Sequence, residues 1–351
     1  MAKKKYTEQD ISILEWREAV RLRPAMYLGS TGFSGFTNLV KAIMQNLFFQ
    51  TKCSHFEIDL TDKLNGAITF YNLQLSVKDS INEDLQLVSF EFAAFNALSQ
   101  KYEFTLFDEN QKVLLNQVYQ KGVLKKGKVE QKEFFSDSLK IDFELDNSIW
   151  DFEKINVHNL NDEIRELAFL CNEKKFELKY QERGEQSRIV YNFENGLLDK
   201  LEIEKSWVDA KIRNTSKKEF DNFSMDLAFG LSPFYYTEKF IGSYVNFSKT
   251  EEHGTHVIGL IKVIKKGLKL YLKKHFPDKK IWLKSSSVKK YLFAAIHIQI
   301  EKPAYCGPTR SKLQTYEIIK PISKYVAEIV LQELEKDPKS AEDIVRHFEY
   351  V

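Results

Sequence analysis

Residues 14–30 read Leu-Glu-Trp-Arg-Glu-Ala-Val-Arg-Leu-Arg-Pro-Ala-Met-Tyr-Leu-Gly-Ser, and the interpretation of the whole chain starts from this stretch. The polar residues 1–13 that precede it are predicted to form an extended arm. Residues 37–50, which follow it, carry apolar side chains at helical spacing and are predicted to form a helix with one buried stripe. The stripe consists of Leu39, Val40, Ile43, Met44, Leu47 and Phe48.

The composition is that of a globular protein of about two domains at roughly 100–200 residues each. The chain has 351 residues, of which 43% are hydrophobic and 29% charged, and a formal net charge of only +2 excludes a global attraction to nucleic acid. The sequence contains no uninterrupted apolar run of about 18 residues, which argues against a membrane span. Its three cysteines, Cys53, Cys171 and Cys306, are too scattered for a disulfide framework and favour a cytoplasmic location.

Two kinds of periodicity alternate along the chain and predict an α+β fold. Strands are predicted at residues 56–60, 67–71, 102–106, 113–119, 139–145, 176–180 and 189–193, and helices at 90–99 and 161–171. The charged residues 121–133 are predicted to form a loop. From about Glu204 a second unit is predicted, with strands at 224–227, 243–247 and 291–300 and helices at 257–274 and 318–334, the last ended by Asp337-Pro338.

The quoted stretch resembles the start of the ATPase region in the B subunits of DNA gyrase and topoisomerase IV, most specifically at Arg21-Leu-Arg-Pro-Ala-Met-Tyr-Leu-Gly29. Further motifs follow in the family order: Asn96-Ala-Leu-Ser99, Arg165-Glu-Leu-Ala-Phe-Leu170, Gly254-Thr-His-Val-Ile-Gly259 and Gly307-Pro-Thr-Arg-Ser-Lys-Leu313. The resemblance implies a GHKL-type (Bergerat) ATPase-like α/β sandwich over residues 14–203. A transducer domain, similar to domain 2 of ribosomal protein S5, would follow over residues 204–351.

The first predicted helix departs from the family at the positions that handle ATP. Hydrolysis needs a carboxylate that activates water, and Mg²⁺ needs oxygen ligands. The resemblance places these groups on this helix, as a Glu followed by Asp-Asn, and the matching residues here are Ala42, Gln45 and Asn46. Ala42 cannot act as a base, whereas Asn46 can still hold Mg²⁺. Two interpretations remain open for this helical face: a residual metal site or a plain solvent-exposed surface.

The glycine-rich segments of the family are also altered. Asn72 stands where the family has the Asp that binds adenine, and an Asn oxygen can accept the same hydrogen bond. The segment between Asn72 and Ser89 is short for the family's phosphate-binding lid, and Glu91 would place a negative charge against phosphate. The family's Thr-Gly-Thr turn becomes Asp137-Ser-Leu139. We therefore expect no cofactor, with ATP and Mg²⁺ retained only if the site is residually functional.

The second predicted domain keeps a partial match to the family's loop that sends a lysine to the γ-phosphate. Its glutamine position is Pro308 and its lysine position is Arg310, followed by Lys312. Arg310 and Lys312 are candidate phosphate contacts, although Arg310 can equally be a surface arginine. His253 and His256 form a His-x-x-His pattern, but a hydrogen-bonded turn explains it better than a metal, because further ligands are missing.

The predicted helix over 257–274 carries Lys262, Lys266, Lys269 and Lys273 on one face, opposite Leu260, Ile264, Leu268 and Tyr271. This lysine face is either a solvated surface or a contact for DNA phosphates. Because the family's transducer lines a cavity that passes DNA, the second interpretation has a structural rationale.

The first hypothesis is a non-hydrolysing pseudo-ATPase that acts by binding itself, a topoisomerase B subunit or DNA. In the family the N-terminal arm reaches the partner subunit, so Tyr6 and Ile11 are candidate dimer contacts. The sequence ends at Val351, before the family's DNA-cleavage domain, and the lost motifs favour a natural short paralogue over a fragment. The alternatives are an ATP-hydrolysing topoisomerase subunit in which Glu91 or Asp79 replaces the base, and a DNA-binding scaffold that uses the lysine face.

Overall fold

The computed structural model describes residues 14–77, 90–127, 134–182, 184–204, 210–233, 241–278, 283–307 and 310–346. The chain divides into two compact units. The N-terminal unit consists of Met1–Glu166 with Glu173–Asn192, and the C-terminal unit of Leu167–Asn172 with Phe193–Val351. The predicted arm over residues 1–13 and most of the expected lid segment, residues 78–89, lie outside the described residues.

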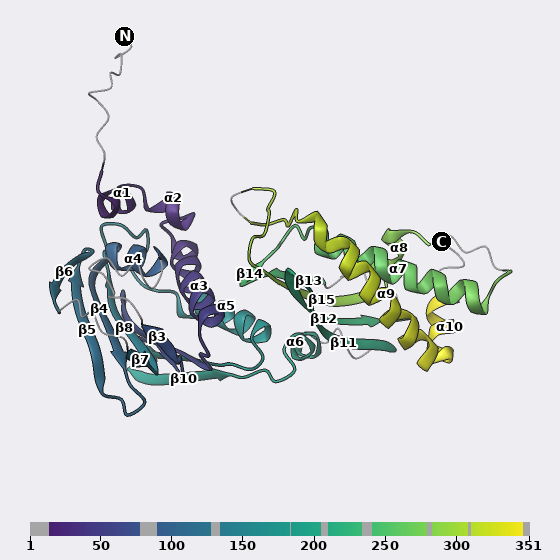
Figure 1. Ribbon diagram of the computed structural model, residues 1–351, viewed down its shortest axis with the longest axis horizontal. Coiled ribbons are helices and arrows are strands. Elements are labelled where there is room, and N and C mark those ends of the chain that lie inside the picture. Colours follow the sequence, from purple (N-terminus) through teal and green to yellow (C-terminus); the bar gives the residue numbers. More distant parts are fainter. Residues whose placement is uncertain are drawn as a thin grey trace, which may run out of the picture. The chain divides into compact units, whose positions relative to one another are not determined.

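An eight-stranded sheet, at the left of Figure 1, belongs to the N-terminal unit. Its strands lie in the order β10-β9-β1-β2-β8-β4-β5-β6. In chain order they are β1 (His55–Asp62), β2 (Asn65–Tyr71), β4 (Ser99–Phe107), β5 (Val113–Gln120), β6 (Val123–Lys126), β8 (Ser138–Leu145), β9 (Lys175–Glu182) and β10 (Glu185–Tyr191). All neighbours pair antiparallel except β1 and β9, which are parallel. A small second sheet pairs β3 (Leu75–Val77) with β7 (Phe134–Ser136).

Helices lie along one face of this sheet and beyond one of its ends (Figure 1). They are α1 (Trp16–Leu22), α2 (Pro24–Leu28), α3 (Phe33–Gln50), α4 (Phe90–Ala97) and α5 (Val157–Leu170). The predicted stripe on α3 is fully buried, and the ring of Phe48 lies 6.3 Å from that of Phe70 on β2. Helix α4 places Phe92 6.1 Å from Phe104 on β4. This aromatic layer, which strand alternation predicts, is the core of the unit.

The predicted loop over residues 121–133 is wrong in its first part, because Val123–Lys126 forms the edge strand β6. Lys121 and Gly122 both have positive φ, 50° and 80°, which is the backbone of a two-residue hairpin turn between β5 and β6. The predicted helix over residues 90–99 also ends earlier, at Ala97, and Ser99 already begins β4.

The C-terminal unit has a five-stranded sheet in the order β11-β12-β15-β13-β14, on the right of Figure 1. The strands are β11 (Ile212–Glu219), β12 (Phe223–Leu231), β13 (Ile241–Val245), β14 (Ser248–Lys249) and β15 (Leu292–Ile300). The helices are α6 (Leu197–Ile203), α7 (Thr255–His275), α8 (Ser285–Lys289), η2 (Tyr316–Ile318), α9 (Ile319–Lys336) and α10 (Pro338–Arg346). The apolar sides of α7 and α9 share one core with the strand residues Met225, Leu227 and Ile296.

Several elements of the C-terminal unit do not appear in the sequence prediction, among them β11, β14, α6, α8 and α10. Strand β11 is almost entirely polar outside Ile212, helix α6 is short, and α10 follows the predicted break. Pro338 does end α9, but it then begins α10, because proline is accepted in the first turn of a helix. Among the described residues, every helix is too short or too polar to span a bilayer.

Candidate functional site

Helix α3 brings Ala42, Gln45 and Asn46 together on one face, as their spacing predicts. All three are half-buried, whereas the apolar stripe on the other side is buried. The Asn46 side-chain oxygen is buried and has no hydrogen-bond partner among the described residues. A buried oxygen without a hydrogen-bond partner has the chemistry of a metal ligand. Of the three residues on this face, Asn46 is therefore the one that could contribute a ligand to a divalent cation. No carboxylate accompanies it on this face of α3, since its neighbours are an alanine and a glutamine.

A carboxylate does reach α3 from α5, but it is already paired. Glu163 forms an ion pair with Lys41, the residue before Ala42. Glu91, one of the two substitutes considered for the missing base, lies half-buried in the first turn of α4. The other substitute, Asp79, lies outside the described residues.

Asn72 lies directly after β2, in a left-handed backbone conformation with φ 57°. Its side-chain nitrogen donates to the Ser54 hydroxyl at 2.6 Å, so its carbonyl oxygen points away from that bond. The next residue, Leu73, is buried and donates its backbone N–H to Asp137. Asn72 is therefore held by its neighbours at an exposed position from which its oxygen can still accept a hydrogen bond.

The loop that contains Arg310 and Lys312 is fastened to the turn before α7. Backbone bridges join Leu313 to Gly254 and to Tyr305, and the Ser311 hydroxyl donates to the Glu252 carboxylate at 2.7 Å. Arg310 is exposed and has a positive φ of 56°, while Lys312 is half-buried.

The same turn explains His253 and His256 without a metal. His253 Nδ1 lies 2.8 Å from the Ser243 hydroxyl, and His256 Nε2 lies 3.3 Å from the Thr250 hydroxyl. Burial, followed by the neighbouring histidines, lowers the pKa of His256 to about 3, so its ring is neutral. The His-x-x-His pattern therefore holds a turn together, as the sequence prediction preferred.

The lysine face predicted on α7 is present as a surface. Lys262, Lys266, Lys269 and Lys273 are all exposed, and Leu260, Ile264, Leu268 and Tyr271 opposite them are buried. The helix begins and ends close to the predicted bounds, so the periodicity predicted both faces correctly.

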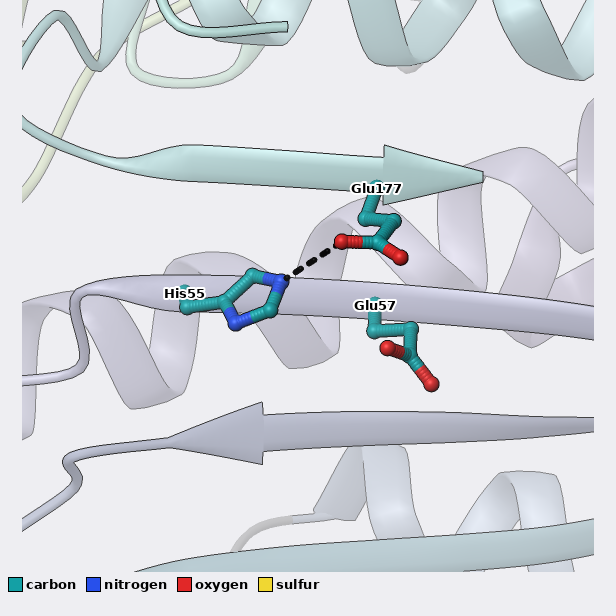
Figure 2. Close-up of side chains that lie close together, drawn as sticks. All are labelled: His55, Glu57 and Glu177. Carbon is teal, nitrogen blue, oxygen red and sulfur yellow. Dashed lines mark ion pairs between the residues drawn. The ribbon is translucent and has the colours of Figure 1, made fainter. Parts of the chain in front are cut away.

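A charged cluster on the outer face of the N-terminal sheet does not appear among the sequence candidates. Figure 2 shows the His55 imidazole on β1 directed at Glu177 on β9, with Glu57 beside them, and His55 Nε2 lies 3.5 Å from Glu177 Oε2. Strand alternation was the available signal, because it turns His55 and Glu57 away from the buried Phe56 and Ile58.

A His-Glu-Glu group can in principle bind a metal, but cations already occupy these carboxylates. Arg188 on β10 donates Nε and Nη2 to Glu177 at 2.6 and 3.0 Å, and Lys179 donates to Glu57 at 2.8 Å. The hydrogen bond from Arg188, with help from Lys175, holds the pKa of the Glu177 carboxyl well below its usual range. The cluster is therefore an ion network that joins β1, β9 and β10, and its chemistry does not fit a metal site.

Arg21, in the stretch 14–30, connects separate elements of the N-terminal unit. Arg21 on α1 donates Nη2 to the buried Asp146 carboxylate and Nη1 to the Ala97 carbonyl, both at 2.6 Å. Burial alone would raise the pKa of Asp146, but the hydrogen bonds from Arg21 and Ser148 outweigh it and hold that pKa well below its usual range. Arg21 thus joins α1 to the end of α4 and to the residue that follows β8.

The comparisons with known proteins agree with this fold. Residues 195–349 match the family model described as DNA gyrase B. The DNA gyrase B protein of Borreliella burgdorferi is 25% identical over 97% of this chain and 58% of its own length, and that of Helicobacter pylori strain 26695 is 25% identical over 97% and 47%. The chain thus spans about half the length of these curated relatives.

Solved structures give the same result. The 43K ATPase domain of Thermus thermophilus gyrase B, in complex with an aminocoumarin, superposes with a TM-score of 0.75 at 20% identity, covering 95% of this chain and 94% of that one. The topoisomerase IV ATP-binding domain of Francisella tularensis, in complex with a small-molecule inhibitor, gives a TM-score of 0.76 at 21% identity, with 95% of each chain covered.

Fold and comparisons together define the class: an α+β chain with a GHKL-type ATPase-like sandwich followed by a transducer domain of the S5-domain-2 type. Within that class the chain is similar to DNA gyrase B proteins over 97% of its length, and it shares its fold with the solved ATPase domain of gyrase B and the solved ATP-binding domain of topoisomerase IV.

Proposed function

We propose that this protein acts by binding, as a non-hydrolysing relative of the gyrase and topoisomerase IV B subunits, with a nucleotide-domain fold over residues 14–203 and a transducer over 204–351. The observation that supports it most is Ala42 on the half-buried face of α3, beside Gln45 rather than a carboxylate. A methyl group neither orients nor deprotonates water, so the general-base contribution to hydrolysis is lost.

Residual nucleotide binding remains compatible with the side chains present. Asn46 would offer an oxygen to Mg²⁺, Asn72 an oxygen to an adenine amino group, and Arg310 with Lys312 positive charge to phosphates. Bound Mg²⁺ would neutralise phosphate charge, as it does in nucleotide sites generally. Because these contacts require no proton transfer, binding can persist where turnover does not.

Self-association is the mode of action that the surface of the N-terminal unit favours. Leu22, Met26, Tyr27 and Phe90 are large apolar residues with exposed fractions between 44% and 72%, and the rings of Tyr27 and Phe90 lie 5.7 Å apart. Exposed apolar groups of this kind mark association surfaces. We propose that this surface and the arm, with Tyr6 and Ile11, pair with a second copy or with a topoisomerase B subunit.

DNA is the second candidate partner, because the lysine face of α7 is exposed along its length. Its test is the salt dependence of DNA affinity. If the face binds phosphates, reversing Lys266 and Lys269 to Glu weakens binding to DNA of any sequence and flattens the salt slope. A double variant with an unchanged slope would exclude the lysine face as the contact.

The deciding experiment measures ATP and Mg²⁺ binding by calorimetry, with phosphate release followed in the same sample. We expect no turnover, with or without binding, and weaker binding of any nucleotide when Asn46 is replaced by Leu. Turnover by the wild-type chain that is lost in Glu91→Gln would instead support the rearranged-site alternative.

The dimer is tested separately by sedimentation of the full chain, of a chain that lacks residues 1–13, and of the variant Met26→Ser. A monomer at all concentrations would contradict self-association and leave a heterologous partner. A dimer that dissociates on either change would support it.

A further inference from the structure

Polar side chains are buried where α4 packs on the N-terminal sheet. Asn96, Tyr102 and Gln117 each have no exposed surface. Both amide atoms of Asn96, the Tyr102 hydroxyl and the Gln117 side-chain nitrogen find no hydrogen-bond partner among the described residues. Buried polar atoms in folded proteins are nearly always hydrogen-bonded, so several such atoms in one region need an explanation.

The three side chains converge on one layer between α4 and strands β4 and β5. Phe92, one helical turn before Asn96, places its ring 6.1 Å from that of Phe104 on β4, so Asn96 lies on the face of α4 that meets the sheet. Gln117 on β5 is the cross-strand partner of Phe104. Residues paired across antiparallel strands point to the same face, so Gln117 also faces α4.

Tyr102 belongs to the same layer. Its cross-strand partner is Tyr119, the two rings lie 6.3 Å apart, and the Tyr119 hydroxyl donates to the Gln117 side-chain oxygen at 2.9 Å. The Tyr102 ring also meets Phe95 of α4 edge-on at 5.6 Å. The side chains of Asn96, Tyr102 and Gln117 therefore face one layer that is otherwise aromatic.

We propose that this region is an internal hydration site, in which ordered water joins Asn96, Tyr102 and Gln117. The donors and acceptors are complementary to water: the Gln117 nitrogen and the Asn96 nitrogen donate, the Asn96 oxygen accepts, and the Tyr102 hydroxyl does either. Buried waters typically make about three hydrogen bonds of this kind. The site would hold the last turn of α4 to the sheet through water, just after the segment that the sequence predicts as the lid.

The sign of a stability change tests the proposal. Tyr102→Phe removes one hydroxyl and nothing else, so it lowers the melting temperature if the hydroxyl holds a water. If the hydroxyl is unpaired in the folded protein, the same variant raises the melting temperature, because an unsatisfied polar atom is removed. A raised melting temperature would therefore overturn the proposal.

A double-mutant cycle separates a shared water from independent losses. Tyr102→Phe and Asn96→Leu remove two partners of the same site, so their effects are expected to be less than additive. The matched control is Thr51→Val, which removes a direct hydrogen bond from the Thr51 hydroxyl to the Leu47 carbonyl at the end of α3, and it should add to Tyr102→Phe because the two residues share no partner. Additivity in both pairs would contradict a shared water.

Water–protein nuclear Overhauser effects on the full chain give the direct measurement. We expect a long-lived water with cross-peaks to the Asn96 side-chain amide and the Tyr102 ring. A lowered melting temperature without such cross-peaks would also overturn the proposal, since it would mean that the three side chains bond one another directly.

Discussion

Two regions of the N-terminal unit match the gyrase B pattern to different degrees. In the stretch before α3, Arg21 belongs to the motif that resembles gyrase B. It makes two short hydrogen bonds, to Asp146 and to the Ala97 carbonyl. On the half-buried face of α3, Ala42 and Gln45 depart from the pattern, and neither of these uncharged side chains can form an ion pair. The matching residue holds elements together, whereas the departing ones occupy positions that would handle ATP. The residues that hold this fold together are therefore different from the residues that ATP chemistry would need.

In the C-terminal unit, Gly254 is a residue that, like Arg21, holds two segments together. Its φ is 138°, and an added Cβ would lie 2.3 Å from the Leu313 carbonyl oxygen. The close approach of Gly254 to Leu313 joins residues 310–313 to the turn before α7. The glycine is required for packing, whatever Arg310 binds.

Gly254→Ala should give the largest effect. The added Cβ strains the backbone at this φ and also clashes with the fixed Leu313 carbonyl. Together these two effects should lower the free energy of unfolding by about 3–4 kcal/mol. Urea unfolding measures it, with Gly307→Ala as control, because a Cβ on Gly307 would meet nothing within 4 Å. Equal loss in both variants would show that the Gly254 contact does not matter.

Arg21→Met should cost about 2–3 kcal/mol, because it leaves the buried Asp146 carboxylate with the more distant Lys121 as its one cation among the described residues. The control is Arg165→Met, whose ion pair with Asp162 is exposed and worth little. If both variants unfold at the wild-type urea concentration, Arg21 has no anchoring role and the comparison above fails.

Lowering the pH should destabilise the C-terminal unit. Burial lowers the pKa of His256 to about 3 and that of His297 to about 4, so both are neutral when folded and take up a proton on unfolding. Their stabilising contribution is full above pH 6.5, the ordinary value, and is lost as the pH falls toward the folded pKa. Between neutral pH and pH 5, each of the two histidines therefore lowers the free energy of unfolding by about 2 kcal/mol.

The measurement is urea unfolding at pH 7.5 and pH 5, for wild type and His297→Gln. The variant should lose less stability between the two pH values. His297 donates Nε2 to the Asn246 carbonyl at 2.8 Å, a bond that a glutamine nitrogen can keep. An identical pH dependence in the two proteins would assign the loss to other groups.

Ala42→Glu should give the smallest effect, within about 0.5 kcal/mol, because a half-buried helix position away from the core tolerates a charge. Thermal unfolding measures it, with Ala93→Glu as the contrasting variant, because Ala93 is fully buried in α4. A large loss at Ala42 would mean that this position is structural and that the alanine was selected for packing.

Periodicity and one specific motif determined much of this protein from sequence alone. The apolar stripe of α3, the two faces of α7 and most strands follow from spacing, because burial of one face imposes its period on the sequence. The stretch around Arg21 and the motifs after it indicated the family and the α+β class. Local patterns carry these properties, so no three-dimensional information was needed.

The tertiary structure alone decided which distant groups meet. No spacing pairs Arg21 with Asp146 or Gly254 with Leu313, since each contact joins segments that are far apart in the sequence. The polar strand β11 also needed tertiary context, because its pairing with β12 and not its own pattern makes it a strand. The same holds for Asn96 on α4 and Gln117 on β5, because packing of the helix on the sheet and not their own sequence pattern buries these two polar side chains.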